Sequence, residues 1–447
     1  IPAPGLPGPL ILWGDQAHAV VTPELGATSH AVVAAATWGG GRVVVFGHDG
    51  YVTDATRDMP TLLANVAAWH AESLAASRHD ADEQASPDEG SDAAESSTDK
   101  RLRPGPSTLR VFGLADAASA ELSRRGFRIE DWQRGVTTQR VPVSPSPGGD
   151  ASAESDPAGS LSRTASPRVA NWRAAVDSGG LDLLMLSSHG LQAAEDRERL
   201  RRFVVEQRGT LLLGGLGWGW RQLHPAQRIA EHPGNLLLAD VGIAWSEATV
   251  HEWYVDAFAV GSTARRWAHA GEALRGIEAF VASSGRPERE GQRDPWPRAE
   301  RAAAVESVRL AIDELADPAH PILQRIAELV APHRARLDAV YRTMARTPVS
   351  SVREPLGKLD LALFRRVDFM RDAQEVTAHP SASAFPGEVP VNAPRVAETR
   401  VVSLAVPGWH STGWYAAAGE TLTVRVPAEF RRLGLRMQIG AHQDEQR

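Results

Sequence analysis

Three apolar runs of strand length constrain the fold of this 447-residue chain more than any other feature. They are RVVVF (42–46), LDLLML (181–186) and GTLLLGG (209–215), and none of them alternates apolar with polar residues. A strand with one face in water would alternate, so these strands are expected to be buried on both faces. Amphipathic segments such as PTLLANVAAW (60–69) and AAEDRERLRRFVVEQ (193–207) would supply the covering helices. The pattern predicts an α/β domain with a mostly parallel sheet.

Composition divides the rest of the chain. Two stretches, at about 78–106 and 144–167, are rich in Asp, Glu, Ser and Pro and poor in apolar residues, so they are expected to be disordered inserts. With these inserts, residues 1–247 form the predicted α/β domain. Apolar residues at three- and four-residue spacing predict a helical connector over 248–375. Residues 376–447 begin with a Pro-rich linker and then predict β-strands around an Ala-Ala-Ala-Gly-Glu turn.

Charge and residue usage exclude several classes of function. The 48 Lys and Arg residues against 55 Asp and Glu residues give a net charge of −7, which argues against a nucleic-acid-binding protein. The absence of cysteine excludes thiolate metal sites and a cysteine nucleophile. No run approaches the roughly 20 apolar residues of a membrane span. The start IPAPGLPGP shows neither an initiator Met nor a signal peptide, so compartment, oligomeric state and whether Ile1 and Arg447 are natural ends stay open.

A helical zinc-peptidase site is missing from the sequence. Such a site needs two imidazoles one helical turn apart with a carboxylate between them, the H-E-x-x-H pattern. His251-Glu252 begins the pattern, but Val255 stands where the second histidine belongs, and no two of the 15 histidines are four positions apart. The sequence therefore predicts no metal ligand and no cofactor in this chain.

Polar residues follow two of the predicted strands. His48 and Asp49 come after the first, and Ser188 and His189 come after the second. Strand ends of open α/β sheets converge on a ligand crevice, so these four residues are candidates for a ligand pocket. Ser188 with Gly190 is also half of a nucleophile elbow, although Leu186 replaces its first glycine, so a serine hydrolase is a further possibility. An ordinary turn with side-chain-to-backbone hydrogen bonds remains the simplest interpretation.

The loop LLLGGLGWGW follows a third strand. Gly215, Gly217 and Gly219 give G-x-G-x-G, which is neither the dinucleotide fingerprint nor a P-loop. These glycines are expected to permit tight turns, with Trp218 and Trp220 packing beside them. The alternative is an aromatic platform on which Trp218 and Trp220 bind a ligand.

Several segments together resemble known families. RVVVFGHDGYV with PTLLANVAAW, and FVVEQRGTLLLGGLGWGW with HPGNLLLADVGI, resemble the N-terminal region of the TRP-channel-associated factor (TCAF) family. WHSTGWYAAAGETLTVRVP with GLRMQIGAHQD is similar to the opening of the peptidase unit in enhancin-like, mucin-targeting zinc metallopeptidases, peptidase family M sixty. The matching tract positions are Trp409, Ser411, Thr412, Gly413, Tyr415, Gly419 and Glu420.

The resemblance implies a glutamine-amidotransferase-like α/β domain, a helical connector and the truncated start of a β-sandwich. In the family the zinc helix follows this point and the amidotransferase thiol is absent here, so the resemblance assigns no catalytic residue. It implies a non-catalytic accessory or recognition region of a zinc metallopeptidase, with zinc in the missing catalytic part. It further implies a glycoprotein or glycan partner and weakly favours a secreted or cell-surface location. The alternatives are a stand-alone carbohydrate- or protein-binding module and the serine hydrolase.

The tract residues also have a physical role without the resemblance. Ser411 and Thr412 are expected to bind turn amides, and Gly413 and Gly419 to permit positive φ. Tyr415 would pack the hairpin. The alternative is direct carbohydrate contact through Trp409, Trp414 or Tyr415.

Overall fold

The computed structural model describes most of the chain, and its residues fall into two compact units, Ile1–Ala273 and Leu274–Arg447. The described residues are 6–22, 30–53, 57–84, 108–133, 136–138, 171–250, 266–283, 296–315, 317, 319–342, 349–368, 371–379 and, with further gaps, 382–437.

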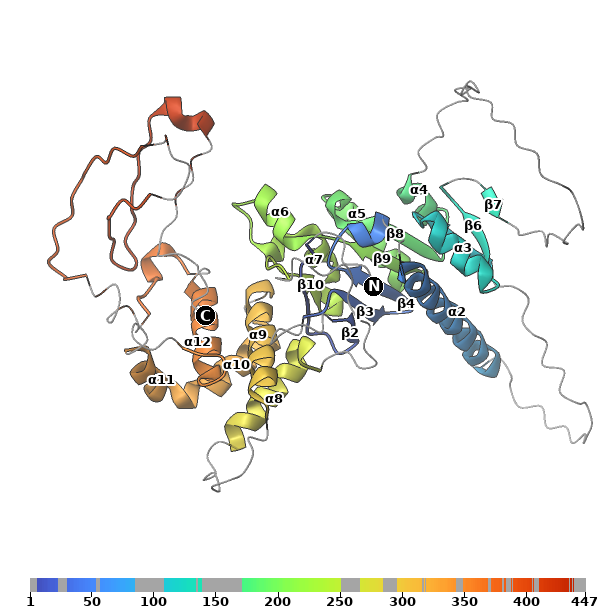
Figure 1. Cartoon of the computed structure of the whole chain (residues 1–447), viewed down its shortest axis with the longest axis horizontal. Coiled ribbons are helices and arrows are strands. Elements are labelled where there is room, and N and C mark those ends of the chain that lie inside the picture. Colours follow the sequence, from blue (N-terminus) through green and yellow to red (C-terminus); the bar gives the residue numbers. More distant parts are fainter. Residues whose placement is uncertain are drawn as a thin grey trace, which may run out of the picture. The chain divides into compact units, whose positions relative to one another are not determined.

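The first unit is built on an eight-stranded sheet with the order β2-β3-β4-β9-β8-β5-β6-β7 (Figure 1). Five central strands pair in parallel: β4 (Gly41–Phe46), β9 (Thr210–Gly214), β8 (Leu183–Ser187), β5 (Thr108–Phe112) and β6 (Arg128–Asp131). The antiparallel strands lie at the edges: β2 (Ala17–Val21), β3 (Val33–Trp38) and β7 (Val136–Thr138). The predicted mixed α/β fold with a largely parallel sheet is confirmed.

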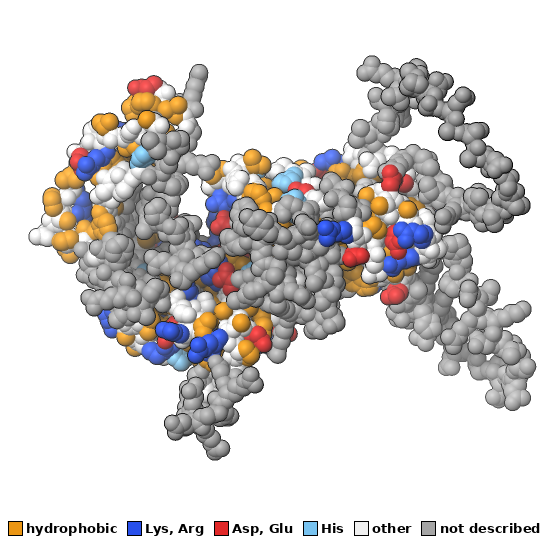
Figure 2. All heavy atoms as spheres, viewed as in Figure 1, with side chains coloured by type: hydrophobic (Ala, Val, Ile, Leu, Met, Phe, Trp, Pro, Cys, Tyr) orange, Lys and Arg blue, Asp and Glu red, His pale blue; other side chains and the backbone are white. Residues whose placement is uncertain are grey.

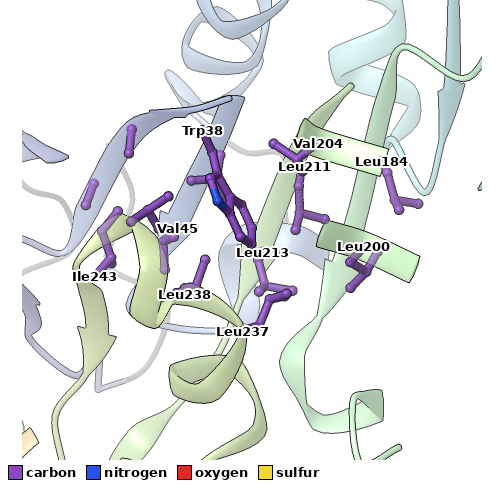
Figure 3. Packing of buried hydrophobic residues seen from close by; sticks show 14 of the residues in the cluster. Trp38, Val45, Leu184, Leu200, Val204, Leu211, Leu213, Leu237, Leu238 and Ile243 are labelled. Carbon is purple, nitrogen blue, oxygen red and sulfur yellow. The ribbon is translucent and has the colours of Figure 1, made fainter. Parts of the chain in front are cut away.

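Both faces of the sheet are covered, as the unbroken apolar strands require. Every residue of β4 and β9 is buried. Val43, Val45 and Leu213 point into one cluster with α5 (Ala194–Val205) and α7 (Pro233–Leu238), where Trp38 packs across Leu213 (Figure 3). The alternate residues of the same strands pack against α2 (Met59–Gln84) and α3 (Asp116–Arg124) on the other face. Successive side chains leave opposite faces of a strand, so a strand between two helical layers must be apolar throughout.

A second, two-stranded sheet joins the two ends of this unit. β1 (Leu10–Leu12) pairs antiparallel with β10 (Ile243–Trp245). Glycines permit the close approach, since a Cβ on Gly14 would stand 2.1 Å from the Val241 carbonyl oxygen. The indole Nε1 of Trp245 donates to the Phe46 carbonyl over 2.8 Å, which ties β10 to the carboxyl end of β4.

The remaining helices of the first unit are short or flank the sheet. They are α1 (Gly50–Thr53), α4 (Trp172–Asp177) and α6 (Gly217–Leu223), with the 3-10 turns η1 (Ser188–Gly190), η2 (Ile229–Glu231), η3 (Ala239–Val241) and η4 (Arg266–Ala268). The helix α2 continues to Gln84, so residues 78–84 are helical and do not belong to the first polar insert. Adding residues to an existing helix costs far less than starting one. The rest of that insert, 85–106, and the second insert lie outside the described residues.

Helices form most of the described chain between Ala270 and Asp368. They are α8 (Ala270–Ser283), α9 (Arg298–Glu314), α10 (Pro321–Val330), η5 (Ala331–His333), α11 (Arg334–Tyr341) and α12 (Pro355–Asp368). The buried Tyr341 hydroxyl donates to Asp360 Oδ2 over 2.7 Å, and Arg334 reaches the same oxygen at 2.6 Å. This contact joins α11 to α12 within the second unit.

The strands expected after residue 376 do not form among the described residues there. Most of the described residues there have no regular secondary structure; η8 (Ala428–Leu433) is a 3-10 helix among them, and η6 (Ala373–Glu375) precedes the segment. Exposed apolar side chains along the segment include Val391, Val396, Val401, Tyr415, Val426 and Leu433. Figure 2 shows hydrophobic side chains, in orange, on the surface of the molecule. A strand pair that buries no apolar face has too little stabilisation to persist in water, which accounts for the difference.

The glycine conformations and side-chain-to-backbone hydrogen bonds predicted for the turns of the tract are nevertheless present. Gly413 and Gly419 have φ of 69° and 80°. Ser411 Oγ accepts from the Gly413 amide at 3.4 Å, and Thr412 Oγ1 accepts from the Trp414 amide at 3.3 Å. The other tract residues face outward: Glu420 pairs with Arg395, and the Tyr415 hydroxyl donates to the Gly387 carbonyl over 2.8 Å. Trp409 lies outside the described residues.

Candidate functional site

The carboxyl ends of β4 and β8 meet at one edge of the sheet, on either side of β9. The turn after β4 carries His48 and Asp49, and η1 follows β8. The two turns are joined by hydrogen bonds, because the Ser187 hydroxyl donates to Asp49 Oδ1 over 2.9 Å. The structure therefore brings the polar residues of the two strand ends together, although Ser187 makes the contact in place of Ser188.

Asp49 is the centre of this cluster. Its Oδ2 lies 2.7 Å from Nε2 of His189, whose side chain is 41% exposed. Burial alone would raise the pKa of Asp49, but the hydrogen bond and charge of His189 and the bond from Ser187 outweigh it, so the pKa is lowered. The hydrogen bond to Asp49 raises the pKa of His189 despite its partial burial. The two side chains thus form an ion pair at the carboxyl edge of the sheet.

His48 belongs to the turn. Its Nδ1 accepts the Gly50 amide over 2.8 Å, and burial lowers its pKa, only partly offset by the charge of Asp49. His48 therefore holds the conformation that presents Asp49.

The Ser188 side chain points away from Asp49. Its side chain has no exposed surface, and its Oγ lies 2.5 Å from the point at which a Cβ on Gly215 would stand. Ser187 and His189 lie on the opposite side and contact Asp49. Ser187 is the last residue of β8 and Ser188 the first of the 3-10 turn η1, so the backbone changes conformation between the two serines.

A buried aromatic cluster lies behind η1. His232 is fully buried, and its ring centroid is 5.2 Å from those of both Trp220 and Trp245. Burial, reinforced by the positive charge of His189, lowers the pKa of His232 to about 3, so the ring is neutral. Sequence reasoning did not single out His232 or Trp245: His232 opens the segment HPGNLLLADVGI, but no local pattern indicated that its ring is buried between two tryptophans.

The two loop tryptophans have different environments. Trp220 is 2% exposed, with His224 stacked on its ring at 4.6 Å, so it packs in the core and is no exposed platform. Trp218 is half-buried, and its Nε1 donates to the Leu6 carbonyl over 2.9 Å.

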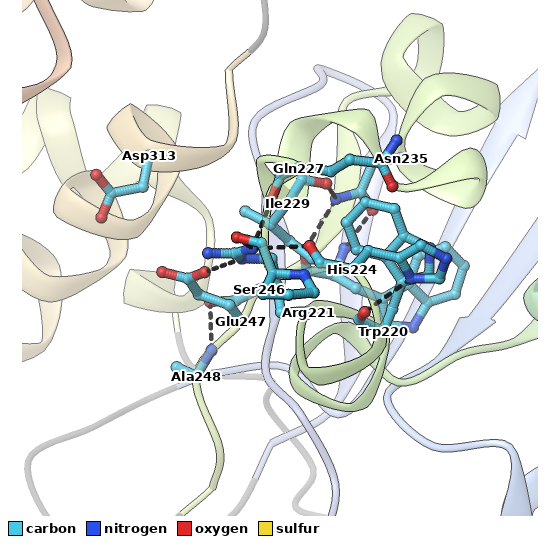
Figure 4. Close-up of polar contacts among 12 residues, drawn as sticks. Trp220, Arg221, His224, Gln227, Ile229, Asn235, Ser246, Glu247, Ala248 and Asp313 are labelled. Atoms are coloured by element: carbon cyan, nitrogen blue, oxygen red, sulfur yellow. Dashed lines mark hydrogen bonds and ion pairs between the residues drawn. The ribbon is translucent and has the colours of Figure 1, made fainter. Parts of the chain in front are cut away.

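Two polar side chains fix the loop that carries His232 (Figure 4). Arg221 pairs with Glu247 at 2.8 Å and donates to the carbonyls of His224, Pro225 and Gln227. Asn235 donates to the carbonyls of Ile229 and Trp245 and accepts the Trp245 amide. These contacts connect the loop to α6, α7 and β10.

The arrangement favours binding over nucleophilic catalysis. In a hydrolase triad the histidine stands between the serine and the carboxylate. Here the carboxylate of Asp49 stands between Ser187 and His189, and among the described residues no serine is bonded to a histidine ring at this site. The described part of the chain contains no group of three His, Asp or Glu side chains arranged to hold a metal ion. In the same part, no helix combines the length and apolar character needed to cross a membrane.

The fold and site define an α/β domain of the type that gathers polar groups at the carboxyl edge of its sheet. Residues 391–447 match the family model described as the N-terminal domain of M60-like peptidases. TRPM8 channel-associated factor 2 of Homo sapiens is 28% identical over an alignment of 290 residues that covers 58% of this chain and 29% of that protein. Residues 391–447 are thus similar to M60-like peptidases, and a larger part of the chain is similar to a TRP-channel-associated factor, the two families that the sequence motifs resemble.

One solved structure is also similar, IMPa from Pseudomonas aeruginosa in complex with an O-glycopeptide. It is 15% identical, with a TM-score of 0.36, over 81% of this chain and 35% of that chain. The chain therefore matches about a third of the length of either relative.

Proposed function

We propose that this chain is a non-catalytic accessory and recognition region of an M60-like zinc metallopeptidase that acts on glycoproteins. The observation that carries the proposal is the match of residues 391–447 to the N-terminal domain of M60-like peptidases. The sequence contains no H-E-x-x-H, so the zinc that activates water for peptide hydrolysis would be held by a part of the protein outside these residues. On this proposal the chain itself holds no zinc.

The finer fold assignments belong to the same proposal. The five parallel strands with helices on both faces support a glutamine-amidotransferase-like domain. The exposed apolar side chains of residues 391–437 support a segment that completes its β-structure against further peptidase sequence. Burial of those side chains would supply the stabilisation that strands in this segment need.

The polar cluster at the strand ends supports a recognition role. The Asp49–His189 pair is partly exposed and held in place by Ser187 and the turn around His48. Pre-oriented carboxylate and imidazole groups suit hydroxyl-rich ligands, because each offers directional hydrogen bonds. The same observation favours the second candidate, a stand-alone binding module, which a downstream H-E-x-x-H in the same reading frame would argue against.

The test uses the purified 447-residue chain on an O-glycosylated mucin. We expect the mucin to be retained by the immobilised chain without being cleaved, and the chain to contain less than stoichiometric zinc. Asp49→Asn should weaken retention, and Asp15→Asn, an exposed carboxylate elsewhere, serves as the matched control. Stoichiometric zinc together with chelator-sensitive digestion of the mucin would show that the chain is itself the peptidase.

The serine hydrolase is tested separately. Because Ser188 Oγ is buried, a fluorophosphonate probe should not label the chain. Labelling that disappears in Ser188→Ala would restore that assignment.

A further inference from the structure

The helix α7 begins with a histidine cap, at a position where serine, threonine, aspartate or asparagine is usual. His232 Nδ1 accepts the Gly234 amide over 3.1 Å, and Pro233 between them has no N–H to satisfy. A ring nitrogen accepts a hydrogen bond only while it carries no proton, so the neutral ring has its proton on Nε2. A proton on Nδ1 would place a second donor against the amide. The start of α7 therefore depends on an uncharged His232.

The surroundings of His232 disfavour the charged ring. Its side chain has no exposed surface, and its ring centroid lies 5.2 Å from those of both Trp220 and Trp245. Among the described residues, Nε2 finds no hydrogen-bond partner. An imidazolium in this position would lose its hydration without gaining a hydrogen-bond acceptor, so the folded structure favours the neutral ring.

The charged groups around His232 do not offset its burial. Burial is the largest effect, His189 and His224 act in the same direction, and Asp49 opposes them, so the pKa of His232 is lowered to about 3. Two ion pairs at the loop that carries His232 add no net charge: Arg221–Glu247 and Arg228–Glu231. A histidine in water has a pKa of about 6.5. Between these two values, His232 gains a proton only when its ring leaves the aromatic cluster for water.

The first turn of α7 connects His232 to the candidate site. Asn235 lies in this turn, donates to the Trp245 carbonyl over 3.0 Å and accepts the Trp245 amide over 2.8 Å. The indole Nε1 of Trp245 donates to the Phe46 carbonyl at the end of β4. The turn that carries Asp49 follows Phe46 directly. Opening of the first turn of α7 would therefore remove the contacts that hold β10 against the end of β4.

We propose that proton uptake by His232 opens the first turn of α7 and separates β10 from the carboxyl end of β4. The closed form is fully stable above about pH 6.5 and loses stability as the pH falls toward about 3, because only the open form is protonated in that range. The population of the open form should rise about thirtyfold between pH 7.5 and 5.0. The inference goes beyond the accessory role proposed above, since it requires neither a ligand nor a peptidase.

The test measures hydrogen exchange of the Gly234 amide and the Trp245 indole N–H in the full, ¹⁵N-labelled chain at pH 7.5 and 5.0. These two groups are hydrogen-bonded only in the closed form. After correction for the intrinsic exchange rates, we expect the protection of both groups to be about thirtyfold lower at pH 5.0. Equal protection at the two pH values would overturn the proposal.

The variant His232→Asn isolates the histidine, because an asparagine oxygen can cap α7 but takes up no proton in this range. The change in protection between the two pH values should shrink from about thirtyfold to less than about threefold. His18→Asn, at an exposed histidine of β2, is the matched control and should keep the pH dependence of the wild type. A pH dependence in His232→Asn equal to that of the wild type would assign the effect to another group and overturn the proposal.

A measurement on the wild type tests the proposal even if His232→Asn does not fold. The ¹⁵N shifts of the His232 ring should show a proton on Nε2 and none on Nδ1, and they should not change between pH 7.5 and 5.0. A ring that carries its proton on Nδ1, or that titrates at about pH 6.5 while the chain stays folded, would contradict both the cap and the proposal.

Discussion

At the scale of single residues, Asp49 and His189 make the stability contributed by the candidate site depend on pH. The pKa of His189 is raised, so its contribution to stability is complete below its unfolded value near 6.5 and is lost as pH rises through the folded value. The pKa of Asp49 is lowered, so its contribution is complete above about 3.8 and is lost as pH falls through the folded value. The pair therefore stabilises the fold most between about pH 4 and 6.5.

The variant Asp49→Asn tests this coupling. Removing the carboxylate should lower the pKa of His189, because its burial then acts without a counter-charge. The loss in unfolding free energy should be larger at pH 5.5 than at pH 8, and small at both, because the pair is partly exposed to water. An NMR titration of the His189 ring and urea unfolding at the two pH values provide the measurements. A histidine titration identical to that of the wild type would contradict the assignment.

At the scale of elements, His70 fastens α2 to the sheet. Its Nδ1 lies 2.9 Å from Thr210 Oγ1 at the start of β9, and its Nε2 lies 3.6 Å from Asp182 Oδ1 just before β8. His70 is 2% exposed and Thr210 is fully buried. Asp182 also accepts the Arg110 amide over 2.7 Å, so one polar cluster connects the helix with the three neighbouring strands β9, β8 and β5.

Thr210→Val replaces the hydroxyl with a methyl group of similar size and leaves a buried nitrogen of His70 without its partner. We expect a loss of about 1–3 kcal/mol in unfolding free energy, the cost of an unsatisfied buried polar group. Thr108→Val, at an exposed position of β5, is the matched control and should change stability by less than about 0.5 kcal/mol. Equal urea midpoints for the two variants would show that the His70 contact has no energetic role.

At the scale of the whole molecule, the pairing of β1 with β10 joins the two ends of the first compact unit. Residues 1–273 include both β1 and β10, whereas residues 1–240 lack β10 and with it the buried Ile243 and Trp245. We expect the longer polypeptide to unfold cooperatively and the shorter one to lose near-ultraviolet circular dichroism and its thermal transition. Ala244→Pro in the longer polypeptide should lower the melting temperature, because proline removes a ladder donor from β10. A cooperative transition in residues 1–240 would contradict this account.

The local pattern of side chains was sufficient to predict part of the fold and part of the candidate site. The unbroken apolar runs of β4, β8 and β9 predicted buried parallel strands, because burial on two faces excludes polar side chains. The tract from Trp409 to Glu420, read in register, was enough to recognise the M60-like relationship. The convergence of Asp49 and His189 followed from their positions after β4 and β8, two parallel strands that end at the same edge of the sheet.

Other features depend on contacts that no local pattern encodes. The pairing of β1 with β10 and the burial of His232 between Trp220 and Trp245 arise only when distant segments pack together. Whether Ser187 or Ser188 faces Asp49 depends on where β8 ends, and a shift of one residue reverses it. The sequence by itself determined which segments are apolar enough to be buried, since that is a property of each segment. Only the tertiary structure decided which polar groups meet, since a hydrogen bond needs both partners placed to within a fraction of an ångström.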